Sequence, residues 1–412
     1  MTPAVDAELR ERVRRLPGMK RLLPALAGLP PAYLVGGAVR DLLRGADVVD
    51  LDIAVEGDAQ ATARALADRV RGATRVHERF GTATVQAPDV TFDLAATRRE
   101  SYDRPGALPR VEPATIEEDL ERRDFSVNAM AIGLTGDDLG HLHDPRGGLA
   151  DLETGVIRIL HAGSFLDDAT RLLRAVRYEV RLGFAMDTGT ERAARAAVTE
   201  GAMATVSGAR VRDELMDLLR EVEAVAGVER MRDLGITRAM HPALDPDPDL
   251  VASAALGAVA IGAERSLAAL AALVAGAPDR LEPWLADLHL DARERDTAVR
   301  AARTAPHVAR ELRAREHAPS ELRRLLGGEP LEVLALALAM RAPAEPVMLW
   351  VSELRGVRLE ISGADLLAAG VPEGPALGRA LDETLARKLD GLVAGREQEL
   401  ETALALARAE AK

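Results

Sequence analysis

The chain has 412 residues, no cysteine and a formal net charge of −13 at pH 7. Its length exceeds what one hydrophobic core usually serves, so two or more domains are expected. The lack of cysteine excludes a disulfide partner and a thiolate metal site, and no long apolar stretch is free of charge, so we expect a soluble, cytoplasmic protein with no membrane contact.

The composition favours a helix-rich protein with locally basic surfaces. Hydrophobic residues make up 48% of the chain but aromatic residues only 2%, so aliphatic side chains must fill the core. The acidic net charge argues against a strongly basic nucleic-acid binder. Arginine is nevertheless concentrated in residues 158–212 and 303–324. Such local clusters can form a phosphate-binding track even though the net charge of the whole chain is negative. The alternative for the second cluster is an ordinary solvated helix face.

The pattern of apolar residues divides the chain into a mixed first part and a helical second part. A helical lead-in is expected over residues 1–30, followed to about residue 150 by short strands with intervening helices. The strands are expected at AYLVGG, VVDLDIAV, TATVQA and VTFDLA, and the helices at VGGAVRDLLRG and GDAQATARALADRVR. Beyond about Gly163 the apolar spacing is helical almost to the end. The pattern therefore predicts an α+β head followed by an all-helical body.

The first candidate for chemistry is a strand that runs into Gly36-Gly37 and then a helix. Two glycines let the backbone approach a ligand closely, and the start of the helix offers unpaired N–H groups to a phosphate, with Arg40 one turn later. A glycine pair between a strand and a helix is also common as a plain turn. The segment therefore indicates a phosphate site only in combination with others.

Two carboxylates follow in a predicted strand. Asp50 and Asp52 alternate with apolar residues, so both are expected on the same face of the sheet. Like charges held close together raise each other's pKa unless a cation lies between them, and carboxylate oxygens suit Mg²⁺. Asp93, in a later predicted strand, joins this cluster if the two strands are neighbours. The alternative for these aspartates is a polar strand edge.

The segment RRDFSVNAM places Arg122, Arg123 and Asp124 before a predicted amphipathic helix. Arg123 is a candidate for bidentate binding of triphosphate oxygens, and Asp124 for accepting a hydrogen bond from a ribose hydroxyl. The alternative role for Asp124 is a helix N-cap that satisfies free N–H groups.

The most informative segment is FLDDATRLLRAVRYEVRLGF, in which Asp168 and Arg171 are three residues apart and are expected on one helix face. A carboxylate accepts from an exocyclic amino group, while a guanidinium donates to a ring nitrogen and a carbonyl. The pair therefore suits cytosine and adenine but not uracil or guanine. A basic strip continues beside it at Arg174, Arg177 and Arg181. The alternative is an ordinary surface ion pair.

Together these segments resemble the class II tRNA nucleotidyltransferase and bacterial poly(A) polymerase family, within the DNA polymerase β superfamily. Four motifs match in order: the Gly36-Gly37 turn with Asp50-Leu51-Asp52, then RRDFSVNAM, then DPRGGLADLETGVIRIL, then DDATRLLRAVRY. They cover roughly residues 32 to 190, under half of the chain. Chance recurrence of all four in this order would be exceptional.

The resemblance implies a domain plan and an activity. The plan is an α+β head of the DNA polymerase β nucleotidyltransferase type over residues 31–150, an all-helical neck over 151–212, and an RNA-binding body and tail over 213–412. The segment from Asp144 to Gly148 would be the hinge between head and neck. The activity would be template-independent addition of C and A to the 3′ end of tRNA from CTP and ATP, with release of pyrophosphate. The body and tail would hold the tRNA elbow.

The resemblance also implies roles for individual residues. Asp50 and Asp52 would bind the catalytic Mg²⁺. The residues implied to contact the nucleotide are Gly37, Arg40, Arg123, Asp168, Arg171, Arg174 and Arg177. The residue chemistry described above adds Gly36 and Asp124 to the predicted nucleotide site and Asp93 to the predicted catalytic carboxylates.

This chain departs from the family at the base-reading motif. The usual Glu-Asp-Pro-x-Arg is Asp167-Asp168-Ala169-Thr170-Arg171 here, one carbon shorter at its first acid and without the proline. VEGDA, FGTAT and ITRAMHPAL resemble a subset in which CC addition and A addition are split between enzymes. The alternatives are therefore an A-adding or CC-adding enzyme or a poly(A) polymerase. Outside the family they are a metal-dependent glycosyltransferase or a noncatalytic RNA-binding protein.

Overall fold

The computed structural model describes residues 3–77, 81–88, 90–101 and 110–410, and the chain forms two compact units. The first unit contains residues up to Glu214 together with 221–223 and 233–239, and the second contains the remainder. Within the described ranges, none of the helices has both the length and the apolar character needed to cross a bilayer.

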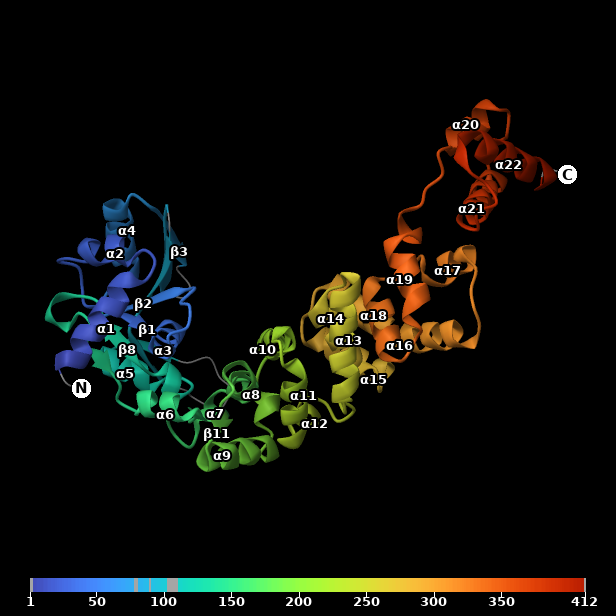
Figure 1. Cartoon of the computed structure of the whole chain (residues 1–412). Coiled ribbons are helices and arrows are strands. Elements are labelled where there is room, and N and C mark those ends of the chain that lie inside the picture. Colours follow the sequence, from blue (N-terminus) through green and yellow to red (C-terminus); the bar gives the residue numbers. More distant parts are fainter. Residues whose placement is uncertain (1–2, 78–80, 89, 102–109, 411–412) are drawn as a thin grey trace. The chain divides into compact units, whose positions relative to one another are not determined.

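The first unit is built on a seven-stranded mixed sheet in the order β3-β4-β5-β2-β1-β8-β9 (Figure 1). Strands β2 and β5 are parallel, and the other neighbouring pairs are antiparallel. The bounds in this sheet are β1 Ala32–Val35, β2 Leu51–Val55, β3 Ala73–His77, β4 Thr82–Ala87, β5 Val90–Ala96, β8 Ala131–Gly133 and β9 Leu142–His143. Two further pairs are β6 Arg98–Ser101 with β7 Arg110–Pro113, and β10 Val156–Ile157 with β11 Ala185–Met186.

Helices precede, flank and follow this sheet. Those wholly in the first unit are α1 Pro3–Arg15, α2 Met19–Ala25, α3 Gly37–Arg44, α4 Ala59–Val70, α5 Ile116–Glu121, α6 Gly148–Thr154, α7 Ser164–Asp167, α8 Thr170–Leu182 and α9 Thr188–Thr199, with 3₁₀ turns η2 Ser126–Asn128, η3 Gly136–Asp138 and η4 Ala202–Thr205. Three helices contain residues of both units: α10 Gly208–Arg220, α11 Ala224–Asp233 and α12 Ile236–Met240.

The second unit is helical throughout its described residues. Its helices are α13 Pro248–Ile261, α14 Arg265–Val274, α15 Pro278–Asp287, α16 Ala292–Ala314, α17 Pro319–Leu326, α18 Leu331–Ala339, α19 Ala344–Ser352, α20 Gly363–Ala368, α21 Pro375–Leu389 and α22 Gly395–Glu410, with a 3₁₀ turn η5 Leu354–Gly356. Small side chains allow close packing, as where the backbone at Gly257 on α13 meets Ala335 on α18. The last helices share a separate core around Leu366, Ala380 and Ala403.

At the centre of the sheet, the carboxylate of Asp52 and the start of α3 lie at the same edge. All four residues of β1 are buried, and in β2 only Asp52 is exposed. Because β1 and β2 are antiparallel with Leu34 opposite Ile53, the end of β1 lies beside the start of β2. The chain leaves β1 at Gly36, whose φ of +65° favours glycine, and enters α3 at once.

Most of the elements expected from the sequence are confirmed, and two expectations are corrected. The four predicted strands correspond to β1, β2, β4 and β5, and the two predicted helices to α3 and α4. The neck is not entirely helical, because β10 pairs with β11 within it. The amphipathic helix expected after Asp124 is also wrong. Ser126 donates to the Arg158 carbonyl at 2.9 Å and Phe125 bridges to Ile159, so tertiary bonds hold this backbone instead of helical ones.

Gly148, in the predicted hinge segment, should tolerate no side chain. A Cβ there would lie 2.2 Å from the Ser126 carbonyl oxygen and 2.9 Å from Met130. Gly148→Ala should therefore lower the free energy of unfolding of the first unit by about 1–3 kcal/mol, measured by urea denaturation followed by circular dichroism.

The matched control is Gly189→Ala on α9, where the new Cβ would have only ordinary contacts, the nearest at 3.7 Å. That change should be neutral or slightly stabilising. Both tryptophans, Trp284 and Trp350, belong to the second unit, so their fluorescence reports its unfolding separately. Equal stability of the two glycine variants would contradict the packing described here.

Candidate active site

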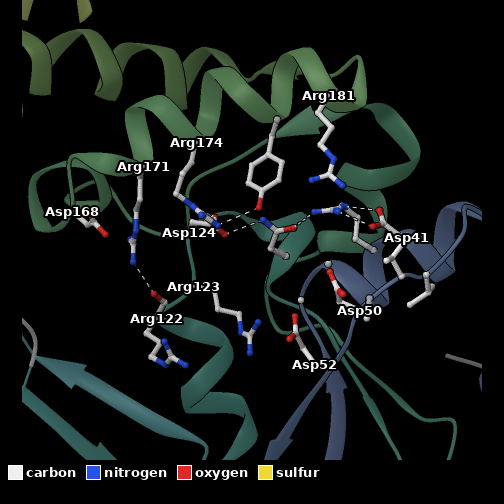
Figure 2. A pocket seen from close by; sticks show the side chains of 18 of the residues that line it. Asp41, Asp50, Asp52, Arg122, Arg123, Asp124, Asp168, Arg171, Arg174 and Arg181 are labelled. Carbon is white, nitrogen blue, oxygen red and sulfur yellow. Dashed lines mark hydrogen bonds and ion pairs between the residues drawn. The ribbon is translucent and has the colours of Figure 1, made fainter. Parts of the chain in front are cut away.

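A cavity of about 1040 Å³ in the first unit brings together most of the predicted site residues. The predicted residues that line it are Gly36, Gly37, Arg40, Asp50, Asp52, Arg123, Asp124, Asp168, Arg171 and Arg174. Figure 2 shows Asp50 and Asp52 on one side and the arginines of α8 on the other. Arg177 and Asp93 are not among the lining residues.

The carboxylate side is formed where β2 begins. Asp50 lies one residue before the strand, so the expected alternation of both aspartates within one strand is corrected for Asp50. Asp52 is in the strand, and Asp93 is its direct partner on the parallel strand β5. The expectation that the two strands are neighbours is thus confirmed. The Asp93 carboxylate accepts a hydrogen bond from Thr84 Oγ1 at 2.6 Å.

These carboxylates carry an excess of negative charge. Asp52 keeps access to solvent, but the cavity walls remove part of its hydration and raise its pKa, and the charges of Asp93 and Asp50 raise it further against the opposing effect of Arg123. In the part of the chain that the structure describes, Asp50 and Asp52 have no hydrogen-bond or ion-pair partner. Neighbouring carboxylates whose charge a single arginine does not balance fit a hard divalent cation.

Arg123 lies beside the glycine turn and points toward Asp52 (Figure 2). A Cβ on Gly36 would lie 3.0 Å from Arg123 Nη1, so a side chain there would push the Arg123 guanidinium away from the turn. Arg123 Nη2 donates to Asp119 at 3.0 Å, whereas its buried Nε has no acceptor among the described residues. A buried guanidinium N–H without an acceptor is a ready donor for an anionic ligand.

Arg40 has a different environment from the one that the glycine motif suggested. It is 3% exposed, its Nε and Nη2 each donate to Asp41 at 2.9 Å, and its Nη1 donates to Asn128 Oδ1 at 2.8 Å. Its guanidinium also lies 5.4 Å from the ring centre of Tyr178. Arg40 is thus held firmly in the cavity wall, and its contact with a nucleotide stays a prediction.

The predicted base-reading pair does not share a helix face. Asp168 is extended, with φ −145°, and the helix α8 begins only after it. Its Oδ1 accepts from the amide and the Oγ1 of Thr170, the first residue of the helix, at 3.0 and 2.6 Å. Its Oδ2 accepts from Arg210 at 2.5 Å, so its ion-pair partner is Arg210 and not Arg171. Asp168 and Arg171 nevertheless line the same cavity.

Arg171 connects α8 to the head through side-chain hydrogen bonds. Its Nη1 donates to Ser164 Oγ at 2.6 Å and its Nη2 donates to the Arg122 carbonyl at 2.8 Å (Figure 2). The side chain is only 7% exposed. The residue next to its acceptor is Arg123, so Arg171 links the two sides of the cavity directly.

Arg174 and Arg177 are held by the carboxylates of Asp124, which is buried, and Glu214, which is partly buried. Asp124 accepts from Arg174 Nε and Nη2 at 2.9 and 2.7 Å, from the Phe125 amide at 2.8 Å and from Asn128 at 3.0 Å. Burial alone would raise the pKa of Asp124, but Arg174 and Asn128 lower it. Glu214 on α10 accepts from Arg174 at 2.9 Å and from Arg177 at 2.8 Å.

These bonds bear on two predicted roles. A carboxylate has about four acceptor sites, and four donors already occupy those of Asp124. Its contact with a ribose hydroxyl stays a prediction, and so does the nucleotide contact of Arg177.

Three residues of the site were not predicted from the sequence. Asn128 bonds both Arg40 and Asp124, Tyr178 lies against three arginines, and Arg210 pairs with Asp168. Asn128 lies inside the RRDFSVNAM motif and Tyr178 on the same side of α8 as Arg171 and Arg174, so spacing offered a signal for both. Arg210 is 42 residues from Asp168 and carries no local signal.

Two known protein families match parts of the chain. The poly A polymerase head domain matches residues 32–158, and the probable RNA and SrmB-binding site of polymerase A matches residues 183–247. A solved structure of a CCA-adding enzyme in its apo form II is similar over 98% of this chain and 96% of its own, with 30% identity and a TM-score of 0.81. These similarities confirm the expected fold class.

Two curated relatives are matched over less than half of their own length. An A-adding tRNA nucleotidyltransferase of Geobacter sulfurreducens is 36% identical over 398 residues, which are 92% of this chain and 45% of the relative. A CC-adding tRNA nucleotidyltransferase of Deinococcus radiodurans is 45% identical over 150 residues, which are 36% of this chain and 40% of the relative. The chain thus spans less than half the length of both.

The raised pKa of Asp52 has a measurable consequence for stability. A carboxyl whose pKa is raised by folding stabilises the folded state when protonated and loses that contribution as the pH rises through its folded pKa. Without divalent metal, Asp52→Asn should therefore raise the unfolding temperature of the first unit at about pH 7.5, and the gain should shrink toward about pH 4, near the ordinary aspartate pKa. Calorimetry in EDTA at a series of pH values measures this.

The matched control is Asp68→Asn, an exposed carboxylate on α4 outside the cavity. It should show no comparable gain. Equal unfolding temperatures of the wild-type protein and Asp52→Asn at about pH 7.5 would show that the carboxylate cluster carries no uncompensated negative charge.

Proposed function

Because the chain belongs to the class II tRNA nucleotidyltransferase and bacterial poly(A) polymerase family, we propose that it adds nucleotides without a template to the 3′ end of tRNA. The proposed donors are CTP and ATP, and pyrophosphate is released. The observation that carries the proposal is one cavity that holds the unpartnered carboxylates Asp50 and Asp52 opposite the pair Asp168 and Arg171. With tRNA as the acceptor, the proposed location is the cytoplasm.

The carboxylate side is the proposed catalytic centre. Asp50 and Asp52 would hold Mg²⁺, since their oxygens suit this ion and lack partners among the described residues. When bound, Mg²⁺ lowers the pKa of the attacking 3′ hydroxyl and neutralises charge on the leaving pyrophosphate. Asp93, opposite Asp52 on β5, is proposed as a third carboxylate of this centre.

The glycine turn and Arg123 are proposed to hold the triphosphate. The helix α3 begins at Gly37 inside the cavity, and the first amides of a helix favour anionic ligands. The buried Nε of Arg123 would donate to a phosphate oxygen from the adjacent wall. Both groups lie next to the carboxylates, where a metal-bound triphosphate would have to be placed.

Asp168 and Arg171 are proposed to read the base. Asp168 would accept from the exocyclic amino group of cytosine or adenine, and Arg171 would donate to the acceptor ring nitrogen of either base and, in cytosine, also to the carbonyl oxygen. Uracil and guanine present the opposite pattern and would leave a buried donor and acceptor unpaired. The glycosyltransferase alternative gives this pair no use and does not account for the family membership.

A second candidate, addition of A alone, is favoured by a specific observation. The Geobacter relative, which aligns with 92% of this chain, is named as an A-adding enzyme, whereas the other two proteins compared above are named for CC and CCA addition. A pocket that recognises the shared edge of cytosine and adenine serves either reaction. The acceptor experiment below separates the two.

The direct test incubates the protein with Mg²⁺, one nucleoside triphosphate at a time, and tRNAs that end before the first C, the second C or the final A. The proposal expects incorporation of CTP and ATP, and A addition alone expects only ATP on tRNA ending in CC. Asp52→Ala should reduce incorporation at least about a hundredfold, as should EDTA, whereas Asp68→Ala on α4 should not. Failure to incorporate any nucleotide, or full activity of Asp52→Ala, would overturn the catalytic assignment.

Base selection has its own test. Arg171→Ala should raise incorporation of UTP and GTP relative to CTP and ATP by about tenfold or more, because the donor that rejects them is removed. The matched control is Arg192→Ala, an exposed arginine on α9 in the same unit. An equal loss for all four nucleotides would contradict a base-reading role and leave Arg171 as a packing residue between α8 and the head.

A further inference from the structure

A second cluster of metal-ligating side chains lies in the first unit and shares no residue with the cavity described above. Asp138, His141 and His143 each offer one ligand atom, and these atoms lie within 4.8 Å of one another. They come from the end of η3, the turn after it and strand β9. Two imidazoles with one carboxylate form a set of donors typical of zinc and related first-row metals.

The hydrogen-bonding capacity of His143 does not satisfy its neighbours. Its Nε2 lies 2.9 Å from Asp138 Oδ2, and its Nδ1 lies 3.3 Å from Glu117 Oε1. With a neutral imidazole, which has only one N–H, one of these carboxylates would face a lone pair. The pair of carboxylates therefore calls for a positive charge here, either a proton on the ring or a bound cation. A cation at this place would relieve the conflict.

A further carboxylate is directed at the cluster from the N-terminal helix. Asp6 on α1 has its Oδ2 3.6 Å from His141 Nδ1. Its Oδ1 is buried without a hydrogen-bond partner among the described residues. Buried carboxylate oxygens are seldom left unpaired, so Asp6 brings a negative charge to the cluster that the described residues do not fully satisfy.

The turn that carries the cluster is held firmly. Arg10 on α1 donates to the Leu139 carbonyl at 2.8 Å, and a Cβ on Gly140 would lie 2.6 Å from Arg10 Cβ. The backbone amide of Gly133 donates to the His141 carbonyl at 3.0 Å. The ring of Tyr33 meets His143 edge-on at 5.3 Å between centroids. The backbone that carries the ligands is thus fixed, so only side-chain rotations are needed to bring them together.

We propose that Asp138, His141 and His143 bind one divalent metal ion of the zinc class. Tetrahedral zinc with bonds of about 2.1 Å needs ligand atoms roughly 3.4 Å apart, a distance that small side-chain rotations reach from the present arrangement. Water or the carboxylate of Asp6 or Glu117 completes the coordination. The ion joins the end of η3 to β9 and stabilises the head independently of catalysis.

The test uses Zn²⁺ and, as a spectroscopic probe, Co²⁺, each added to the EDTA-treated full chain. Zinc should raise the unfolding temperature of the wild-type protein in a concentration-dependent way. Cobalt should give visible absorption of tetrahedral nitrogen and oxygen coordination, and the chain has no cysteine to contribute a thiolate signal. Binding at Asp50 and Asp52 is common to all variants and cancels in the comparison.

The variants are His141→Gln, the double change His141→Gln with His143→Gln, and the control His307→Gln on α16 in the second unit. His141 has 48% of its side chain exposed, so its single variant separates loss of a ligand from loss of the fold. Zinc affinity should fall at least about tenfold in the single variant, and the cobalt absorption should disappear in the double variant. Unchanged affinity and absorption in the His141 variant, or no zinc binding by the wild type beyond that of the double variant, would overturn the proposal.

Discussion

The ion pairs of Arg174 with Asp124 and Glu214 hold the cavity together. Arg174 lies between two carboxylates that come from segments 90 residues apart, and each carboxylate also holds a second group. Removing Arg174 would leave the buried Asp124 without a counter-charge, which is strongly destabilising, whereas Glu214 would keep its ion pair with Arg177. The relative placement of the RRDFSVNAM segment, α8 and α10 therefore depends on this one guanidinium.

The remaining geometry follows from that placement. With α8 fixed, Arg171 reaches the Arg122 carbonyl, and the next residue along the chain is Arg123, beside the glycine turn and Asp52. The proposed base-reading side and the proposed metal side are thus connected through a single stretch of backbone. Such a connection fixes the distance between base and triphosphate, which is what selection without a template requires.

The sequence predicts the fold best where local chemistry decides it. The turn at Gly36 needs a positive φ, and the side chain of Asp58 caps the start of α4. Strand β4 alternates between buried and more exposed residues. These elements agree with the prediction from the sequence. Prediction fails where distant contacts decide. The backbone after Asp124 bonds to residues 158 and 159 instead of forming a helix, and Asp168 pairs with Arg210 on another helix. Neither partner has a signature in the local spacing.

In the proposed mechanism one nucleotide spans both sides of this cavity. A crystal structure of the full chain with Mg²⁺ and a nonhydrolysable CTP analogue would show this. We expect triphosphate oxygens near Asp50, Asp52 and Arg123, with the cytosine edge within hydrogen-bond distance of Asp168 and Arg171. A triphosphate bound at the carboxylates with its base turned away from both residues would contradict it.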